Sequence, residues 1–158
     1  MAAEYSSVGI QSVSSGQPIL FTEDRVPCTQ GLVFHQNGTG VFRIASRVYS
    51  PCPCSRAVYE SLYRVDISGH VAIPEGGTVE EITVQIYTDG EADPQGLVRI
   101  TPAAADTFYH FSTPIIAAVP SICRCSSISV EVSTASGSAV NVLNPNIIFT
   151  PAGVQRVR

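Results

Sequence analysis

Paired cysteines are the residues of this sequence best suited to specific chemistry. They occur as Cys52-Pro53-Cys54 and Cys123-Arg124-Cys125, while Cys28 stands alone. Three interpretations fit the four paired thiols. Four thiolates can close a tetrahedron around zinc, although zinc-binding cysteines are usually spaced by about two to four residues. Disulfides between the two segments, formed in an oxidising medium, are the second interpretation, and unpaired thiols are the third. Cys28 is expected to be a buried small apolar residue.

The remaining reactive side chains do not predict an enzyme. The three histidines lie far apart, at His35, His70 and His110. We expect them at a surface or a subunit interface. Motifs for a hydrolase nucleophile, a zinc protease, a P-loop and a dinucleotide site are all absent. A cysteine–histidine nucleophile has no support from the sequence, so no catalytic residue and no cofactor other than zinc is considered.

Acidic side chains alternate across one turn, at Asp89, Glu91 and Asp93. Their oxygens could coordinate calcium, and a polar hairpin tip explains them equally well. We favour the hairpin tip, because the Asp89-Gly90 dipeptide is itself typical of a tight turn.

Composition restricts the partners of the chain. Its 158 residues are 44% hydrophobic and only 14% charged, with nine arginines, no lysine and a net charge of -4. Nucleic-acid binding through phosphate neutralisation requires a basic stripe, and none is present. The N-terminus lacks a basic region followed by an apolar run, and no apolar run approaches the ~20 residues that span a bilayer. We therefore expect a soluble protein made in the cytoplasm, without a signal peptide or a membrane partner.

Alternation of apolar and polar residues predicts an all-β domain. The pattern is clearest at 63–68, 82–87 and 128–133, and turn dipeptides such as Asn37-Gly38 separate the segments. About ten short strands without a linker favour a sandwich, and a jelly roll suits this number better than an immunoglobulin fold. We expect a short N-terminal arm at residues 1–8, one jelly-roll domain at 9–151 and a C-terminal tail at 152–158.

The order of these features resembles the tumour necrosis factor and complement-head superfamily of jelly rolls. The resemblance rests on Gln17–Phe21, His35–Gly40, Phe42–Ile44, Tyr63–Ile67, Asp89-Gly90 and Asn146–Phe149. It implies a homotrimer that packs through one sheet and its aromatic residues, and Tyr109 and Phe111 are the candidates for that contact. In this strand order the two cysteine pairs fall in connections at the same end of the sandwich.

A narrower resemblance is to small virion proteins of phages that infect Firmicutes. It rests on Val26–Cys28, Tyr63–Val65, Ala72–Val79 and Thr101–Ala104. It implies a trimeric capsid decoration protein at the virion surface, with the major capsid protein or another virion protein as its partner. The alternative is a receptor-binding or adhesive head, on a phage fibre or a bacterial surface, that recognises a glycan or a protein. A secreted cytokine-like ligand is disfavoured by the missing signal peptide.

Overall fold

The computed structural model describes residues 2–28, 31–48, 58–121 and 125–157, and this part of the chain folds into twelve β-strands. The strands are β1 (Ala3–Ser6), β2 (Ile10–Val13), β3 (Gln17–Pro18), β4 (Glu23–Val26), β5 (Val33–His35), β6 (Val41–Ala45), β7 (Tyr59–Ala72), β8 (Ile82–Thr88), β9 (Glu91–Ile100), β10 (Tyr109–Pro120), β11 (Cys125–Thr134) and β12 (Val140–Arg156). None of the described residues forms a helix that could cross a membrane. The expected all-β class is confirmed.

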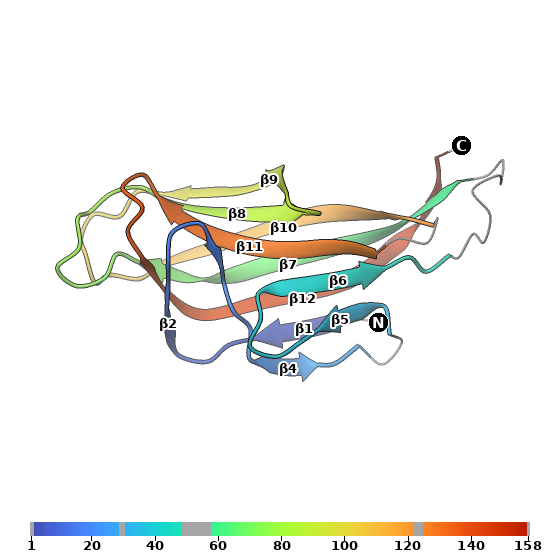
Figure 1. The fold of residues 1–158 in the computed structure, drawn as a ribbon, viewed down its shortest axis with the longest axis horizontal. Coiled ribbons are helices and arrows are strands. Elements are labelled where there is room, and N and C mark those ends of the chain that lie inside the picture. Colours follow the sequence, from blue (N-terminus) through green and yellow to red (C-terminus); the bar gives the residue numbers. More distant parts are fainter. Residues whose placement is uncertain (1, 29–30, 49–57, 122–124, 158) are drawn as a thin grey trace.

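Two antiparallel sheets of six strands make up the domain. Sheet A has the order β10-β7-β12-β1-β4, with β2 paired to β12, and sheet B has the order β5-β6-β11-β8-β9, with β3 paired to β11. The strands β7, β10, β11 and β12 run along the long axis of the molecule (Figure 1). Apart from the consecutive pairs β5–β6 and β8–β9, neighbouring strands are not consecutive in the sequence, so each face combines residues from several segments.

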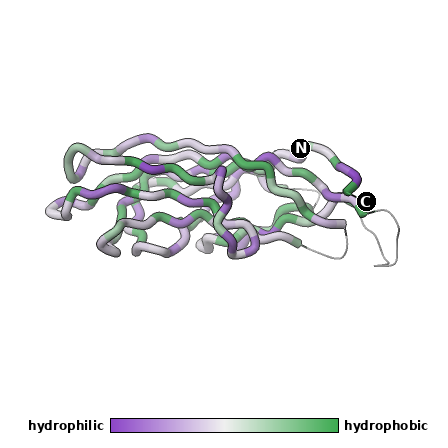
Figure 2. Tube along the Cα trace, turned by 90° about the horizontal axis from the view of Figure 1, so that it is seen from above, coloured by the Kyte–Doolittle hydropathy of each residue, from purple (hydrophilic) through white to green (hydrophobic). Residues whose placement is uncertain are grey.

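Alternation along the strands places the core between the two sheets. In β8, Ile82, Val84 and Ile86 are buried, whereas the residues between them are only partly buried. β10 and β11 follow the same rule, and Figure 2 shows hydrophobic and hydrophilic residues alternating along the strands. Because successive side chains of a strand point to opposite faces, this pattern covers one face of each sheet and leaves the other exposed.

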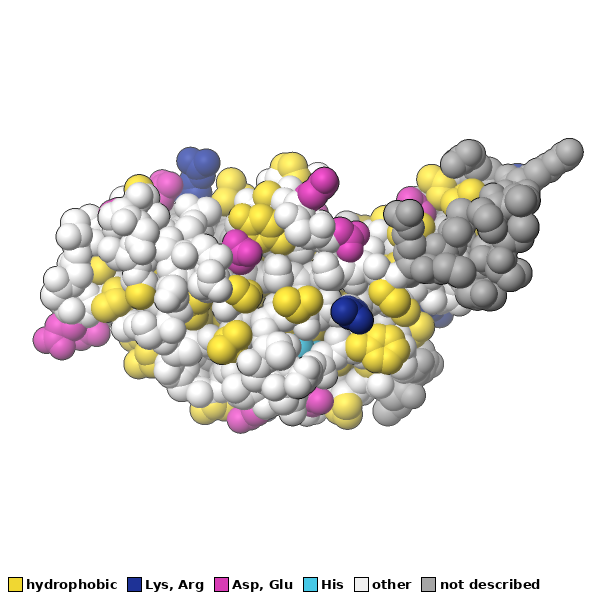
Figure 3. Space-filling view, in the orientation of Figure 1, with side chains coloured by type: hydrophobic (Ala, Val, Ile, Leu, Met, Phe, Trp, Pro, Cys, Tyr) yellow, Lys and Arg dark blue, Asp and Glu magenta, His cyan; other side chains and the backbone are white. Residues whose placement is uncertain are grey.

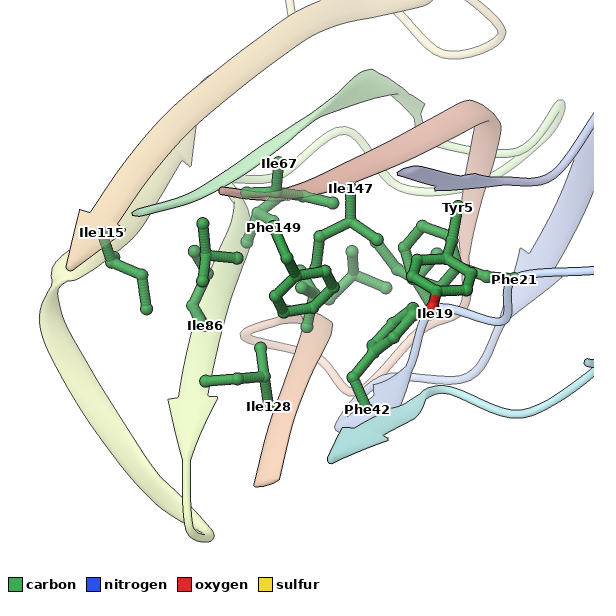
Figure 4. Close-up of a cluster of buried hydrophobic side chains, with 14 of the residues drawn as sticks. Tyr5, Ile19, Phe21, Phe42, Ile67, Ile86, Ile115, Ile128, Ile147 and Phe149 are labelled. Atoms are coloured by element: carbon green, nitrogen blue, oxygen red, sulfur yellow. The ribbon is translucent and has the colours of Figure 1, made fainter. Parts of the chain in front are cut away.

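The core has an aromatic end and an isoleucine-rich end. The ring of Phe42 lies 5.0 Å from that of Tyr5, 5.2 Å from that of Phe21 and 5.0 Å from that of Phe149. Figure 4 shows these four rings together, with the branched side chains of Ile86 and other isoleucines further along the sandwich. Tilted and edge-to-face contacts at these distances are favourable for aromatic pairs, so the cluster holds β1, β6 and β12 together.

Both predicted hairpins are confirmed. β5 and β6 flank Asn37-Gly38, and β8 and β9 flank Asp89-Gly90. Asp89 and Gly90 have φ values of 53° and 81°. This left-handed pair is what a tight two-residue hairpin requires, and aspartate followed by glycine tolerates it well.

The ends of the domain differ from the expectation. Residues 3–6, expected in an arm, form β1, which pairs with both β12 and β4 and buries Ala3 and Tyr5. Strand β12 continues to Arg156, where it pairs with Tyr59. The ends contain few residues with clear alternation, and their pairing with distant strands is what orders them.

Candidate functional site

A cavity of about 700 Å³ opens between the strands β1, β4, β5 and β6. Asp24, His35 and Arg43 provide polar groups, while Phe34 and Val41 are exposed apolar side chains on its wall. Over β5 and β6, Figure 3 shows a histidine close to a basic and a large hydrophobic side chain. A concave surface that combines apolar walls with a few polar groups is the usual form of a ligand site.

His35 forms the floor of this cavity. Its side chain is fully buried and stacks on Phe42, with 4.2 Å between the ring centroids and 17° between the planes. The Nε2 atom lies 3.1 Å from the carbonyl oxygen of Thr39, so Nε2 carries the proton and donates it. Nδ1 is buried without a hydrogen-bond partner, and the Asp24 Oδ1 atom lies 3.8 Å away, beyond hydrogen-bond range. His35 thus lies inside the domain, contrary to the expected surface position.

Tyr5 also lines the cavity, from the opposite strand β1. Burial raises the pKa of its phenol to about 12, with further contributions from the Asp24 carboxylate and from Cys28. Cys28 is half-buried and packs against the core, close to its expected role. The phenol therefore stays neutral at all physiological pH values.

Replacing Tyr5 with phenylalanine is expected to flatten the loss of stability at alkaline pH. The folded pKa of about 12 lies above the ordinary value of 10.0, so the folded chain holds a proton that the unfolded chain releases between these pH values. This contribution is complete below pH 10 and disappears as the pH rises towards 12. Urea unfolding of both proteins at several pH values measures the slope. Equal slopes for wild type and Tyr5→Phe would contradict the assignment.

The predicted cysteine site lies largely outside the described residues, which exclude Cys52, Cys54 and Cys123. Cys125 is the first residue of β11, is exposed and pairs with Ala45 at the end of β6. The described flanks of the two cysteine segments are neighbours. Pro120 pairs with Glu60, and these strand ends lie at one end of the molecule (Figure 1). Among the described residues, no group of three or more potential ligands could hold a metal ion.

The paired cysteines are still predicted to act as one unit. Replacing Cys52 and Cys54 with serine is then expected to destabilise as much as replacing Cys123 and Cys125, with little further loss when all four are changed. Thermal unfolding with chelator and with reductant separates the interpretations, because chelator strips zinc and only reductant opens a disulfide. Additive losses of the two pairs would show that they do not interact.

The two aromatic residues proposed for a subunit contact have different environments. Phe111 is only 2% exposed and packs in the core near Gly69, so its ring is already covered within one protomer. Tyr109 is half-buried, and its hydroxyl accepts a hydrogen bond from the Ala103 backbone at 2.9 Å. Of the two, only Tyr109 has side-chain surface left to offer a second subunit.

The acidic residues Asp89, Glu91 and Asp93 lie in the β8–β9 hairpin, as the interpretation as a polar hairpin tip predicted. The Asp89 carboxylate accepts a hydrogen bond from the Ser127 backbone at 2.8 Å, and the Asp93 carboxylate accepts one from the Gln95 backbone at 2.9 Å. The Asp89 carboxylate thus satisfies a backbone donor of β11, and the Asp93 carboxylate satisfies one within β9. This is a structural role that requires no calcium.

Comparison with known proteins identifies the fold. The sequence matches no family profile and no curated protein. The globular domain of the zebrafish complement 1qA protein is similar over 98% of both chains, with a TM-score of 0.53 and 9% identity. The sugar-binding C-terminal domain of EclA matches 79% of this chain and 89% of its own, with 14% identity and a TM-score of 0.36. The xylan-binding module CBM22-1 of Paenibacillus barcinonensis Xyn10C matches 97% of this chain and 95% of its own, with 13% identity and a TM-score of 0.38.

These similarities define a class of fold. The match to the complement head covers the whole domain, so this chain is a jelly-roll sandwich of the complement-head type, as its strand order predicted. The two sugar-binding domains are too distant in structure to carry an argument. Fold alone does not determine function, which has to be argued from the surfaces of the molecule.

Proposed function

We propose that this chain is a non-enzymatic head domain that works by binding, as a homotrimer whose subunits meet through the outer face of sheet A. We further propose that it decorates the capsid of a phage. The observation that carries the proposal is the difference between the outer faces of the two sheets.

The outer face of sheet A has apolar side chains of β10 and β12 on either side of one charged pair on β7. Ile116 on β10 pairs with Arg64 on β7, and Arg64 pairs with Thr150 on β12. In the same way Pro114 pairs with Asp66, and Asp66 pairs with Ile148. Ile116 is 56% exposed, an unusual position for an isoleucine at the middle of a strand.

Arg64 and Asp66 neutralise each other within one protomer, and the Glu4 and Glu60 carboxylates of the same face accept hydrogen bonds from Asn146 and Gln155. Arg64 Nε donates to both carboxylate oxygens of Asp66, at 3.1 and 3.0 Å. Apolar side chains around a charged pair, with the other carboxylates already hydrogen-bonded, lower the cost of removing water when another copy covers this face.

The outer face of sheet B is polar at its centre, and its exposed apolar side chains Phe34 and Val41 lie on β5 and β6 at one side. Its central strand β11 presents Ser127, Ser129, Glu131 and Ser133, all half-buried or exposed. The neighbouring β8 adds Gln85 opposite Glu131. Removing water from these hydroxyl, amide and carboxylate groups would be costly without matched partners. This contrast favours sheet A for the subunit contact and leaves sheet B to face water.

The proposal of capsid decoration draws on the sequence resemblance to phage virion proteins, and such a role needs only binding. A protein that binds only the assembled shell stabilises that shell by mass action and needs no catalytic group. Electron microscopy of virions from the encoding phage tests the assignment. Trimeric density on the capsid is the expected result, and density at the tail alone would contradict decoration and favour an adhesive head.

The cavity beside β5 supports a second candidate function, recognition of a glycan. Phe34 is 52% exposed on the wall of the cavity, beside the carboxylate of Asp24 and the guanidinium of Arg43. An exposed ring and charged hydrogen-bonding groups suit the apolar face and the hydroxyls of a sugar. A glycan array probed with wild type and with Phe34→Ala tests this function. Binding lost in the variant supports it, and either no binding or equal binding opposes it.

A further inference from the structure

Two histidines stand side by side on the outer face of sheet A, away from the cavity. His70 on β7 pairs directly with His110 on β10, so both side chains project from the same face. Their ring centroids lie 5.0 Å apart, and the planes are inclined by 59°. The pairing comes from the register of two long strands, β7 and β10, so the backbone holds both rings in place without a loop.

Neither ring has the partners that hold His35 in the core. His35 uses Nε2 as a donor to a carbonyl oxygen and stacks on Phe42. The Nδ1 atom of His70, like that of His35, is buried and has no hydrogen-bond partner. A buried imidazole nitrogen without a partner costs free energy, unless a bound group satisfies it. His110 is exposed, which gives a ligand an approach to the pair from solvent.

The spacing of the rings suits one transition-metal ion. Imidazole nitrogens coordinate such ions at about 2.0–2.1 Å, which places two ring centroids of one site roughly 4.5–5.2 Å apart. The observed 5.0 Å falls within this range. Imidazole suits Zn²⁺, Ni²⁺ and Cu²⁺, whereas Ca²⁺ and Mg²⁺ prefer oxygen ligands. Two imidazoles leave the remaining coordination positions to water or to groups of another molecule.

We propose that His70 and His110 form a binding site for a divalent transition-metal ion on the outer face of sheet A. The site is built within one protomer and does not depend on the proposed trimer. If the trimer forms through this face, bound metal lies close to the subunit contact and links assembly to metal supply.

Calorimetric titration of the purified protein with nickel chloride tests the site. Wild type is expected to bind about one ion per chain with a micromolar dissociation constant. His110→Gln is expected to weaken this binding at least about tenfold, since a single imidazole remains. His110 is exposed, so this variant should fold normally, and Ser112→Gln, two residues along the same face of β10, is the matched control with unchanged binding.

Three results would overturn the proposal. These are absence of nickel binding to wild type, equal binding to His110→Gln, and binding retained in the His70→Gln/His110→Gln double variant. The last result would place the ion elsewhere, for example at the cysteines. Light scattering of the same samples reports the oligomeric state separately, so failure of the trimer and failure of the metal site are distinguishable.

Discussion

Phe42→Ala is expected to lower the free energy of unfolding by about 3–5 kcal/mol, as is typical of a large aromatic side chain removed from a core. Phe42 is fully buried, and its ring contacts those of Tyr5, Phe21, His35 and Phe149. Alanine would remove these contacts and leave a cavity where β6 of sheet B packs against β1 and β12 of sheet A. Urea denaturation followed by circular dichroism measures the loss.

Phe34→Ala is the matched control, because Phe34 lies on the neighbouring strand β5 but is 52% exposed. Its expected loss is within about 0.5 kcal/mol, the usual range for surface substitutions. Similar losses for the two variants would mean that the aromatic cluster does not hold the sandwich together. The same variant serves the glycan test, where its stability must be known.

Ile116→Arg is expected to separate the proposed trimer into monomers. Ile116 is 56% exposed on β10, the edge strand of sheet A, and lies beside Arg64. Arginine at this position would bring a second positive charge into the contact and require it to be desolvated. Loss of one interface anchor with burial of an unpaired charge weakens association by roughly a hundredfold or more. Sedimentation velocity at micromolar concentration measures the change.

Val41→Arg is the control for this variant, since Val41 is similarly exposed, at 47%, but lies on sheet B. It should sediment as wild type does. If Val41→Arg separated the trimer and Ile116→Arg did not, the subunit contact would lie on sheet B and the proposal would be contradicted. Both residues are exposed, so neither substitution should disturb the fold of the protomer.

The strands could be predicted where local pattern and tertiary position agree. The segments at 63–68, 82–87 and 128–133 each bury one face, and period-two alternation reports this directly. β1 and β4 were missed for a physical reason. β4 is exposed at every residue, and β1 is ordered by its pairing with β12, more than 130 residues away. No local pattern can report a contact of that kind.

Alternation also explains the outcome at Tyr109 and Phe111. The sequence shows that these two residues share one face of β10 and that His110 occupies the other. It does not show which face is buried. The structure turns Phe111 inward and exposes His110, which pairs with His70 across the strands. The cavity was missed because four strands supply its wall, from Tyr5 to Arg43, without any shared motif.

For the cysteines, spacing in the sequence suggested a zinc site or disulfides, and the fold shows only that the strands flanking the two cysteine segments are neighbours. Ala45 and Cys125 are paired, as are Glu60 and Pro120, so both connections start from the same end of the sheets. That the two cysteine pairs meet stays a prediction. The serine variants, unfolded with chelator and with reductant, distinguish zinc, disulfides and unpaired thiols.

The mass of the purified protein in solution tests the central claim most directly. Light scattering coupled to size exclusion, at micromolar concentration, should give three times the 16.8 kDa of one chain. This mass would support the proposal that copies of the chain cover the outer face of sheet A. A mass of 16.8 kDa under the same conditions would contradict the trimer and leave this face for another partner.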